Sequence, residues 1–429
     1  MTNLVRMAAW FWACVCVILL VYVDFGSPAL VVNSDYLMTF HTAGWIADHG
    51  QWSILYPQAG ASTFAGEPFD QKAHELLPLL QNFSVAEYMY MPASAYLFAP
   101  LSRLTPSYSL FAFQLISLAC IALSAWLCLG RRVVSAFLLS LAFLPTFLTL
   151  WIGQVGLVFG LLPLSLGFYL ARTDKGFLSG LALSLLSLKP QMLIPAGYLL
   201  FLSLLQKRFS IILGFISGGA AIFAVNYALF GKAMLVAWLE CLKLSDRIYS
   251  DPNFGVNVGM ATSLPRAVLH LLPPESRLKA KLFVYAGAFI LACLGLVAVY
   301  FVQRGGSSNV SAFSTQQKLK YALCIGCLAL PCVVPHLFFY DLCVLLPTCF
   351  FALLPDNESA DKHSADKSNV ALVGSPSVSL RLPVLALFLC VTGYCLALFT
   401  LSGTTPLLLV GAMLIIYLSV LVKLIRNQG

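Results

Sequence analysis

The stretch FLSGLALSLLSLKPQMLIPAGYLLFLSLL, residues 177–205, decides the fold class, because only one charged residue, Lys189, interrupts its apolar sequence. A helix of about 20 apolar residues crosses the hydrocarbon core of a membrane, and this stretch is longer than that. Pro190 has no backbone N–H to donate, so it breaks a helix in the middle of the stretch. We predict two shorter membrane helices that meet at Lys189 and Pro190, the first rising toward the outer side and the second returning.

The composition of the whole chain is typical of a membrane protein. Of its 429 residues, 60% are hydrophobic and 10% are charged, and the mean hydropathy is +0.88. These values lie outside the range of soluble globular domains. We predict an all-α polytopic protein, a single integral membrane domain over residues 1–429 with about 11 or 12 transmembrane helices. The remaining spans are expected at 7–30, 107–129, 133–151, 154–171, 209–230, 281–303, 319–335, 337–354, 382–402 and 405–424.

The basic residues indicate the orientation in the membrane. The formal net charge is +8, but the Lys and Arg residues form short clusters between apolar runs, which argues against nucleic acid as a partner. Short loops rich in Lys and Arg face the cytoplasm. One orientation places every short basic loop inside, so we predict that the N- and C-termini are cytoplasmic. We predict that the protein lies in the cell (inner) membrane. The run 7–30 has no clear cleavage site after it and is expected to be retained as the first span.

Three segments outside the apolar runs are long enough to have their own roles. Segments 31–106 and 231–280 are predicted on the outer side, and both are too long for simple turns, which is typical of functional loops. The first is expected to contain amphipathic helices, one of them YLMTFHTAGWIADHG lying on the bilayer surface. The segment 356–381 is rich in Ser, Asp and Lys, and we predict a disordered cytoplasmic linker.

Asp35 is the first residue of chemical interest. It stands in NSDYLMTFHTAG, residues 33–44, just beyond the first span on the side opposite the basic loops. Two interpretations are open at this point. Ser34 or Asp35 caps the helix that follows by accepting backbone N–H bonds, or Asp35 is a catalytic base.

Other polar residues at the outer ends of the spans also have two interpretations each. Tyr90 in EYMYMP belongs to an interfacial aromatic belt or stacks on a sugar. Gln154 in WIGQVG caps a helix end or contacts a substrate. Lys189 holds a phosphate in a polar cavity or extends to the outer surface. His336 in PCVVPHLFFYDL, with Asp341, belongs to a polar turn or binds a metal, and no third ligand at a fitting spacing is evident.

No metal or cofactor is expected from the cysteines either. Twelve of the 13 cysteines, all except Cys241, fall inside apolar runs, where they behave as small hydrophobic residues. Cys324 and Cys327 form a CxxC pair within a predicted span, which does not favour a redox or zinc site there.

In this order, these pieces resemble glycosyltransferase family 87, membrane mannosyltransferases with a GT-C-like fold. The resembling residues are SDYLMTFHTAGWIADHG with LY at 55 and 56, YMYMP, GQVG, the helix with SLKP, and VVPHLFFYDL. The resemblance implies a polyprenyl phosphate sugar as donor, usually mannose, and a lipid or glycan acceptor at the outer face. It also implies that Asp35 is the catalytic carboxylate of the first outer loop. Asn257 and Arg266 match the family's later outer loop loosely, and the segment from Gly60 to Ser84 is longer than the family leads us to expect.

The predicted reaction is therefore an inverting hexosyl transfer in one displacement. Asp35 accepts the proton of the acceptor hydroxyl, and the lipid phosphate leaves as an anion that needs positive charge. Lys189, Arg266 and His336 are the candidates to supply that charge, and Tyr90, Gln154 and Asn257 are candidates for substrate binding. The alternatives are a flippase or transporter of lipid-linked sugars, which the broken helix at Lys189 favours, and a ligase or polymerase with a diphosphate-linked donor.

Overall fold

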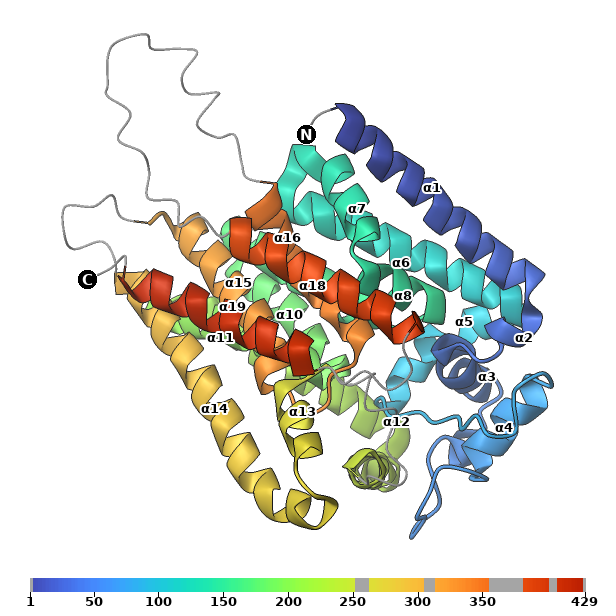
Figure 1. The fold of residues 1–429 in the computed structure, drawn as a ribbon. Coiled ribbons are helices and arrows are strands. Elements are labelled where there is room, and N and C mark those ends of the chain that lie inside the picture. The colour runs from blue at the N-terminus through green and yellow to red at the C-terminus, as the bar shows by residue number, and fades with distance from the viewer. Residues whose placement is uncertain (1–2, 251–261, 305–312, 355–380, 401–406, 427–429) are drawn as a thin grey trace, which may run out of the picture.

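A computed structural model describes the chain except for residues 1–2, 251–261, 305–312, 355–380, 401–406 and 427–429. Every regular element in the described residues is helical, which confirms the all-α polytopic fold (Figure 1). The predicted linker at 356–381, except Arg381 at the start of α18, and the candidate Asn257 lie outside the described residues. The long helices are α1 (Asn3–Gly26), α6 (Pro106–Leu129), α12 (Phe209–Ser250), α14 (Pro274–Arg304), α15 (Thr315–Val333), α18 (Arg381–Thr400) and α19 (Leu407–Arg426).

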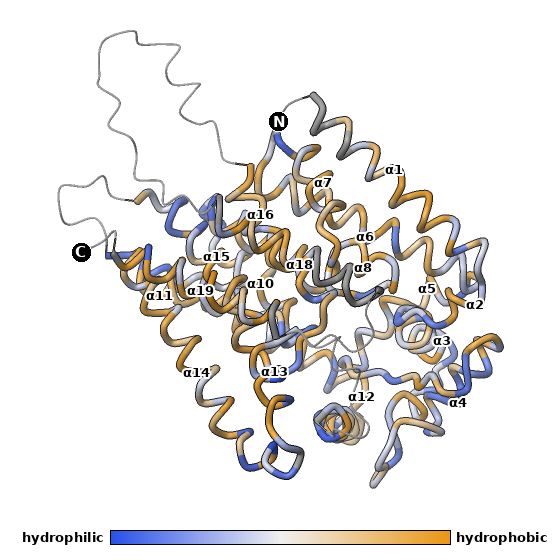
Figure 2. Tube along the Cα trace, in the orientation of Figure 1, coloured by the Kyte–Doolittle hydropathy of each residue, from blue (hydrophilic) through white to orange (hydrophobic). Residues whose placement is uncertain are grey.

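Each predicted span coincides with one or more helices. By length and composition, three helices among the described residues are able to cross a membrane, Pro106–Leu129, Phe209–Tyr249 and Glu275–Arg304. Shorter apolar helices occupy the remaining predicted runs. Among them are α9 (Leu162–Arg172), α10 (Gly176–Ser184), α11 (Leu193–Leu205) and α16 (Leu346–Leu353). Figure 2 shows hydrophobic residues along the long helices and hydrophilic residues concentrated on α4 and at helix ends.

Two spans are broken by proline. The 177–205 stretch ends its first helix in a 3-10 turn, η6 (Leu185–Leu188), and resumes after Lys189 with η7 (Pro190–Met192) and α11, as predicted. The run at 133–151 was expected to be a single span but consists of α7 (Val133–Ala142) and α8 (Leu144–Ile152), bent by 76°. Pro145 explains the second break, because its ring would clash with the carbonyl of residue 141 in a continuous helix.

Helix α12 continues beyond the span predicted at 209–230 and reaches Ser250, within the second outer segment. A kink at Gly231, where φ is +71°, separates its two parts and requires a backbone conformation that glycine adopts without strain. The rest of this segment contains α13 (Leu264–Leu271) and the first turns of α14. The segment 231–280, predicted to be outer, is therefore mostly helical in its described residues, which gives its side chains fixed positions.

The first of the two predicted outer segments, 31–106, folds into a compact layer at one end of the bundle. Figure 1 shows α3 (Thr42–Asp48), α4 (Pro68–Leu76) and α5 (Ala99–Ser102) gathered beyond the ends of α1 and α6. The helix predicted at 36–50 forms over 36–48, beginning as a π-helical turn, η1 (Tyr36–His41). It packs inside the protein rather than on the bilayer surface, since Phe40 and Ile46 are fully buried. Gly44 allows this packing, because a Cβ there would lie 2.6 Å from the backbone of Phe98.

Candidate functional site

Asp35 lies at the start of η1, and its carboxylate is not used as a helix cap. Ser34 Oγ accepts the Leu37 N–H at 3.3 Å, whereas Asp35 makes no capping bond. Instead, Asp35 Oδ2 accepts a hydrogen bond of 2.6 Å from Gln154 Nε2. Gln154 is buried and Asp35 is partly exposed. Two predicted site residues 119 positions apart in sequence therefore meet, and the cap is supplied by Ser34.

The glycines of the GQVG turn bring this contact about. Gly153 has a φ of +69°, and a Cβ there would lie 2.3 Å from the Cβ of Tyr36, next to Asp35. Gly156 begins the π-helical turn η5 (Gly156–Leu161), and a Cβ there would lie 3.5 Å from Lys189 Nζ. Small residues at both ends of the turn thus let it lie between η1 and the helix break at Lys189.

Lys189 lies under this turn and is paired with an acid. Its side chain is buried, and Nζ lies 2.5 Å from Asp341 Oδ1, whose side chain is fully buried. Nζ also lies 5.4 Å from the centre of the Tyr340 ring, a cation–π contact. The interpretation that Lys189 extends to the outer surface is therefore wrong. Its positive charge is already offset by Asp341 of η9 (Phe339–Leu345), so it is not a free cation for a phosphate.

Aromatic side chains surround Asp35 and the ion pair. Tyr90 packs against Phe40, with ring centres 5.1 Å apart, and against Phe159 at 6.4 Å, so it belongs to an interior cluster and not to a membrane belt. Burial raises the pKa of Tyr90 to about 12, and the charges of Lys189, Asp341 and Asp35 all act on its hydroxyl group. Tyr90 therefore lies within electrostatic range of the other candidate residues.

Glu87 is a site residue that the sequence reasoning missed. Its Oε1 accepts a hydrogen bond from the Tyr249 hydroxyl of α12, and its side chain is partly exposed. Burial is the main cause that raises the pKa of Glu87 to about 7, and the charge of Asp35 adds to it. The sequence does contain a signal, because Glu87 directly precedes the YMYMP motif of the resemblance.

Burial also governs the ionisation of Asp35. It raises the pKa of that carboxyl group above its usual range, and the charge of Asp341 acts in the same direction. The hydrogen bond from Gln154 and the charge of Lys189 oppose the shift. A carboxylate with a raised pKa is a stronger base than an ordinary aspartate, provided it is ionised at the working pH.

A second group of polar residues lies beside Tyr249. Its members are Asp246, Lys281, Arg266 and His336: Asp246 accepts from Lys281 Nζ at 2.9 Å and lies 3.0 Å from His336 Nε2. The ring of His336 lies 6.5 Å from the Tyr249 ring. Burial lowers the pKa of His336, so its imidazole is mainly neutral near neutral pH and acts as a hydrogen-bonding group.

Arg266 is the buried cation of this second group. It is 6% exposed, and its Nε has no hydrogen-bond partner within the described part of the chain. Helix α13, which carries it, is fixed to the turn before η9, because the Thr262 N–H donates to the Leu337 carbonyl and Ser263 Oγ donates to the Pro335 carbonyl. A buried guanidinium with a free donor is suited to an anionic group such as phosphate.

The site therefore has two parts with different chemistry. Asp35, Gln154 and Glu87 provide carboxylates and an amide on one side. On the other side Arg266 provides positive charge, His336 provides a neutral hydrogen-bonding group, and Lys281 is paired with Asp246. Within the described ranges, no three His, Cys, Asp or Glu side chains lie close enough together to hold a metal ion. A base and a separate anion-binding group can together support displacement of an anionic leaving group by a hydroxyl.

Comparison with known proteins assigns the family. The model of glycosyltransferase family 87 matches residues 88–331, more than half of the chain, and comparisons with curated proteins and with solved structures gave no match. The matched region includes Tyr90, Gln154, Lys189 and Arg266, while Asp35 and the His336 turn lie outside it. The protein thus belongs to glycosyltransferase family 87 and is a membrane glycosyltransferase.

Proposed function

We propose that this protein transfers a hexose, mannose by its resemblance to the family, from a polyprenyl phosphate sugar to a lipid or glycan acceptor. The reaction takes place at the outer face of the cell (inner) membrane, with both termini in the cytoplasm and a GT-C-like arrangement of the helices. Asp35 is the general base, and the transfer inverts the anomeric carbon. No metal or other cofactor takes part in the proposed steps.

The contact between Gln154 and Asp35 carries the proposal. At 2.6 Å, the amide holds one carboxylate oxygen of Asp35, and in the described part of the chain no hydrogen bond is made to the other oxygen, which we assign to an acceptor hydroxyl. A general base has to reach the proton it removes within hydrogen-bond distance. The Ser34 cap is consistent with this role, since Ser34 Oγ, and not Asp35, accepts the Leu37 N–H at the start of η1.

In the proposed displacement, the acceptor oxygen forms a bond to the anomeric carbon while the bond from that carbon to the phosphate oxygen breaks. The hydroxyl proton passes to Asp35, and the electron pair of the broken bond stays on the lipid phosphate. Because this leaving group departs as an anion, the step requires positive charge near the phosphate rather than a strong acid.

We assign the phosphate to Arg266, with His336 as a neutral donor beside it. Lys189 is less suited to that role, because Asp341 already neutralises it at 2.5 Å. The charge of the paired Lys189 instead acts on Asp35, where it opposes the rise in the pKa of that carboxyl. Tyr90 and Gln154 border the same space, and Asn257 remains a candidate for substrate binding from the family resemblance alone.

The test is a product analysis with membranes that contain the protein, labelled polyprenyl phosphate mannose and total membrane lipid. We expect a labelled lipid or glycan product with wild-type protein and a loss of turnover of about a hundred- to ten-thousand-fold for Asp35→Asn. Asp48→Asn is the matched control, since Asp48 is another aspartate of the same segment and its carboxylate is paired with Arg103. Wild-type turnover in Asp35→Asn would contradict the assignment of the base.

A flippase for lipid-linked sugars is the second candidate, because α10 and α11 form the broken helix that such proteins use for transport sites. Counterflow of substrate in proteoliposomes without a new glycosidic bond would favour it. A diphosphate-linked donor would be indicated if a polyprenyl diphosphate sugar, but not a monophosphate analogue, competed with the labelled donor.

A further inference from the structure

We infer that Glu87 binds hydroxyl groups of the transferred sugar and is a specificity-determining residue, and that Asp70 positions it. This inference rests on the proposed function, since it names a residue that recognises the donor of that reaction. It follows from where Glu87 lies between the two parts of the site and from how its backbone is held.

Glu87 lies between the base and the anion-binding residues. On one side its carboxyl is close enough to Asp35 for that charge to contribute to its raised pKa. On the other side it accepts a hydrogen bond from Tyr249, whose ring lies near His336. In an inverting displacement, the acceptor and the phosphate lie on opposite faces of the anomeric carbon. The sugar ring therefore occupies the space between Asp35 and Arg266, and Glu87 borders that space.

The chemistry of Glu87 suits a sugar. A carboxyl group accepts or shares hydrogen bonds with neighbouring hydroxyls. Tyr249 orients Oε1 of Glu87, and Oε2 makes no hydrogen bond to the described residues, so we assign it to the substrate. The side chain is partly exposed, so a ligand can reach it. Among the ion pairs of the described residues, none involves Glu87, and its printed hydrogen bond is to the neutral hydroxyl of Tyr249. Glu87 is therefore not committed to an ion pair, in contrast to Asp341.

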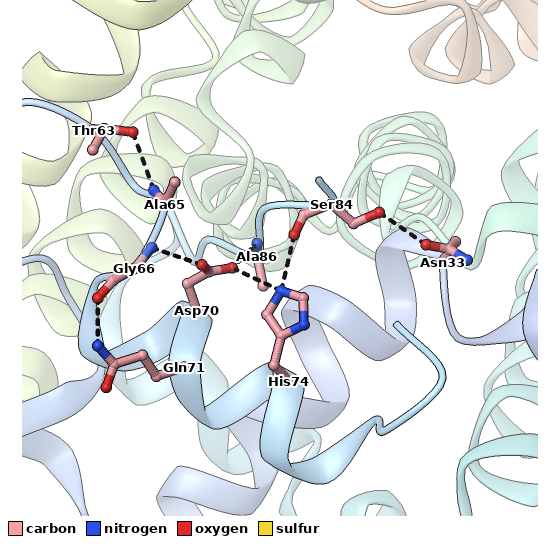
Figure 3. Close-up of polar contacts among 9 residues, drawn as sticks. All are labelled: Asn33, Thr63, Ala65, Gly66, Asp70, Gln71, His74, Ser84 and Ala86. Carbon is pink, nitrogen blue, oxygen red and sulfur yellow. Dashed lines mark hydrogen bonds and ion pairs between the residues drawn. The ribbon is translucent and has the colours of Figure 1, made fainter. Parts of the chain in front are cut away.

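Asp70 fixes the backbone next to Glu87. Figure 3 shows its carboxylate joining two segments of the loop: Oδ2 accepts the Gly66 N–H at 2.8 Å and Oδ1 accepts the Ala86 N–H at 2.7 Å. His74 reinforces the clamp through a contact of 3.1 Å between Nε2 and the Ser84 carbonyl oxygen. Asp70 is buried, so these bonds are shielded from water.

This clamp assigns a role to the long segment from Gly60 to Ser84. The segment carries α4, from which Asp70 and His74 reach the chain that leads into Glu87. Ser84 Oγ also donates to Asn33 Oδ1 at 2.9 Å, two residues before Asp35. The same loop is thus connected to both acidic residues of the site, and Asp70 acts on the sugar through the position of Glu87.

The experiment compares Glu87→Ala with wild-type protein on the natural donor and on four polyprenyl phosphate mannoses that each lack one hydroxyl, at C2, C3, C4 or C6. We expect Glu87→Ala to lower kcat/KM for the full donor by about tenfold to a hundredfold, as expected for lost hydrogen bonds to a charged group. For at least one deoxy donor the variant should cause little further loss, since the hydroxyl that Glu87 binds is already absent. Asp70→Asn should show the same donor dependence with a smaller loss.

Glu75→Ala is the matched control, because Glu75 is an exposed glutamate of α4 paired only with Lys72 among the described residues. It should leave kcat/KM unchanged for every donor. Equal losses for Glu87→Ala on the full donor and on all four deoxy donors would overturn the inference while leaving the proposed function in place. If wild-type protein transfers sugar from none of the five donors, the proposed function and the inference both fail.

Discussion

Replacing Lys189 by methionine is expected to destabilise the protein strongly. The change removes the ammonium group but keeps a long, unbranched side chain in the space at the break between α10 and α11. Asp341 then remains as a buried carboxyl group without the partner that lies 2.5 Å away in the native protein. The perturbation thus tests the charge of Lys189 with little change in packing volume.

The expected cost follows from the burial of both partners. The side chains of Lys189 and Asp341 are 2% and 0% exposed, so water cannot take over the lost interaction. Breaking one side of such a pair typically costs about 3–5 kcal/mol, whereas removing both charges together costs much less. We therefore expect Lys189→Met and Asp341→Asn each to lower the free energy of unfolding by about 3–5 kcal/mol. The double variant should recover most of that loss.

The assay is unfolding of the purified protein in mixed micelles, followed by the fluorescence of its seven tryptophans. The coupling free energy is the difference between the double variant and the sum of the two single variants. Asn is chosen at position 341 because it can still accept the Phe338 N–H, which Asp341 Oδ2 does at 3.2 Å. The reasoning is refuted if the double variant costs the full sum, or if Lys189→Met costs less than about 1 kcal/mol.

Three further changes test the site. Gly153→Ala should lower the free energy of unfolding by more than about 1–2 kcal/mol, because it adds a clash with Tyr36 to the strain of a positive φ. Thermal unfolding measures this change, and Gly197→Ala is the control without a clash. Gln154→Ala should shift the acidic limb of the pH–rate profile to higher pH, because it removes the hydrogen bond that lowers the pKa of Asp35. Activity is lost as the pH falls through that pKa, since the base must be ionised. An unmoved limb would exclude Asp35 as the titrating base. Arg266→Met should raise the KM for the donor by about tenfold or more, and an unchanged KM would exclude Arg266 from the phosphate site.

The positions of the helices could be predicted from the sequence because a chain that spans a membrane has few ways to satisfy its backbone hydrogen bonds. Backbone N–H and C=O groups in hydrocarbon must form hydrogen bonds within each segment, so every long apolar run is helical. Pro190 interrupts its helix because it has no N–H to donate and its ring clashes with the preceding turn. The bend at Phe143 and the continuation of α12 to Ser250 were not predicted. Pro145 was present in the sequence as a signal for the bend, whereas the extent of α12 depends on the neighbours that the helix packs against, which apolar composition does not record.

Individual residues of the candidate site could be predicted from the sequence, but the contacts between them could not. Asp35 and Gln154 were each singled out, yet their contact depends on two glycines whose close packing is visible only in three dimensions. The partner of Lys189 was within reach of sequence reasoning, since a charge in an apolar run needs a counter-charge and Asp341 stands in another such run. Glu87 was missed because an acid in an outer loop is usually solvated.

The length of α14 determines how high above the hydrocarbon the second polar group lies. Its 31 residues extend about 46 Å at 1.5 Å per residue, while the uninterrupted apolar part from Leu282 to Val302 extends about 31 Å and matches a core of roughly 30 Å. We therefore expect Lys281 to lie at the boundary between hydrocarbon and water, and Asp246, which contacts both Lys281 and His336, places His336 near the same level. That is the depth at which the headgroup phosphates of a bilayer lie, so a lipid phosphate could reach this group by moving sideways within its leaflet.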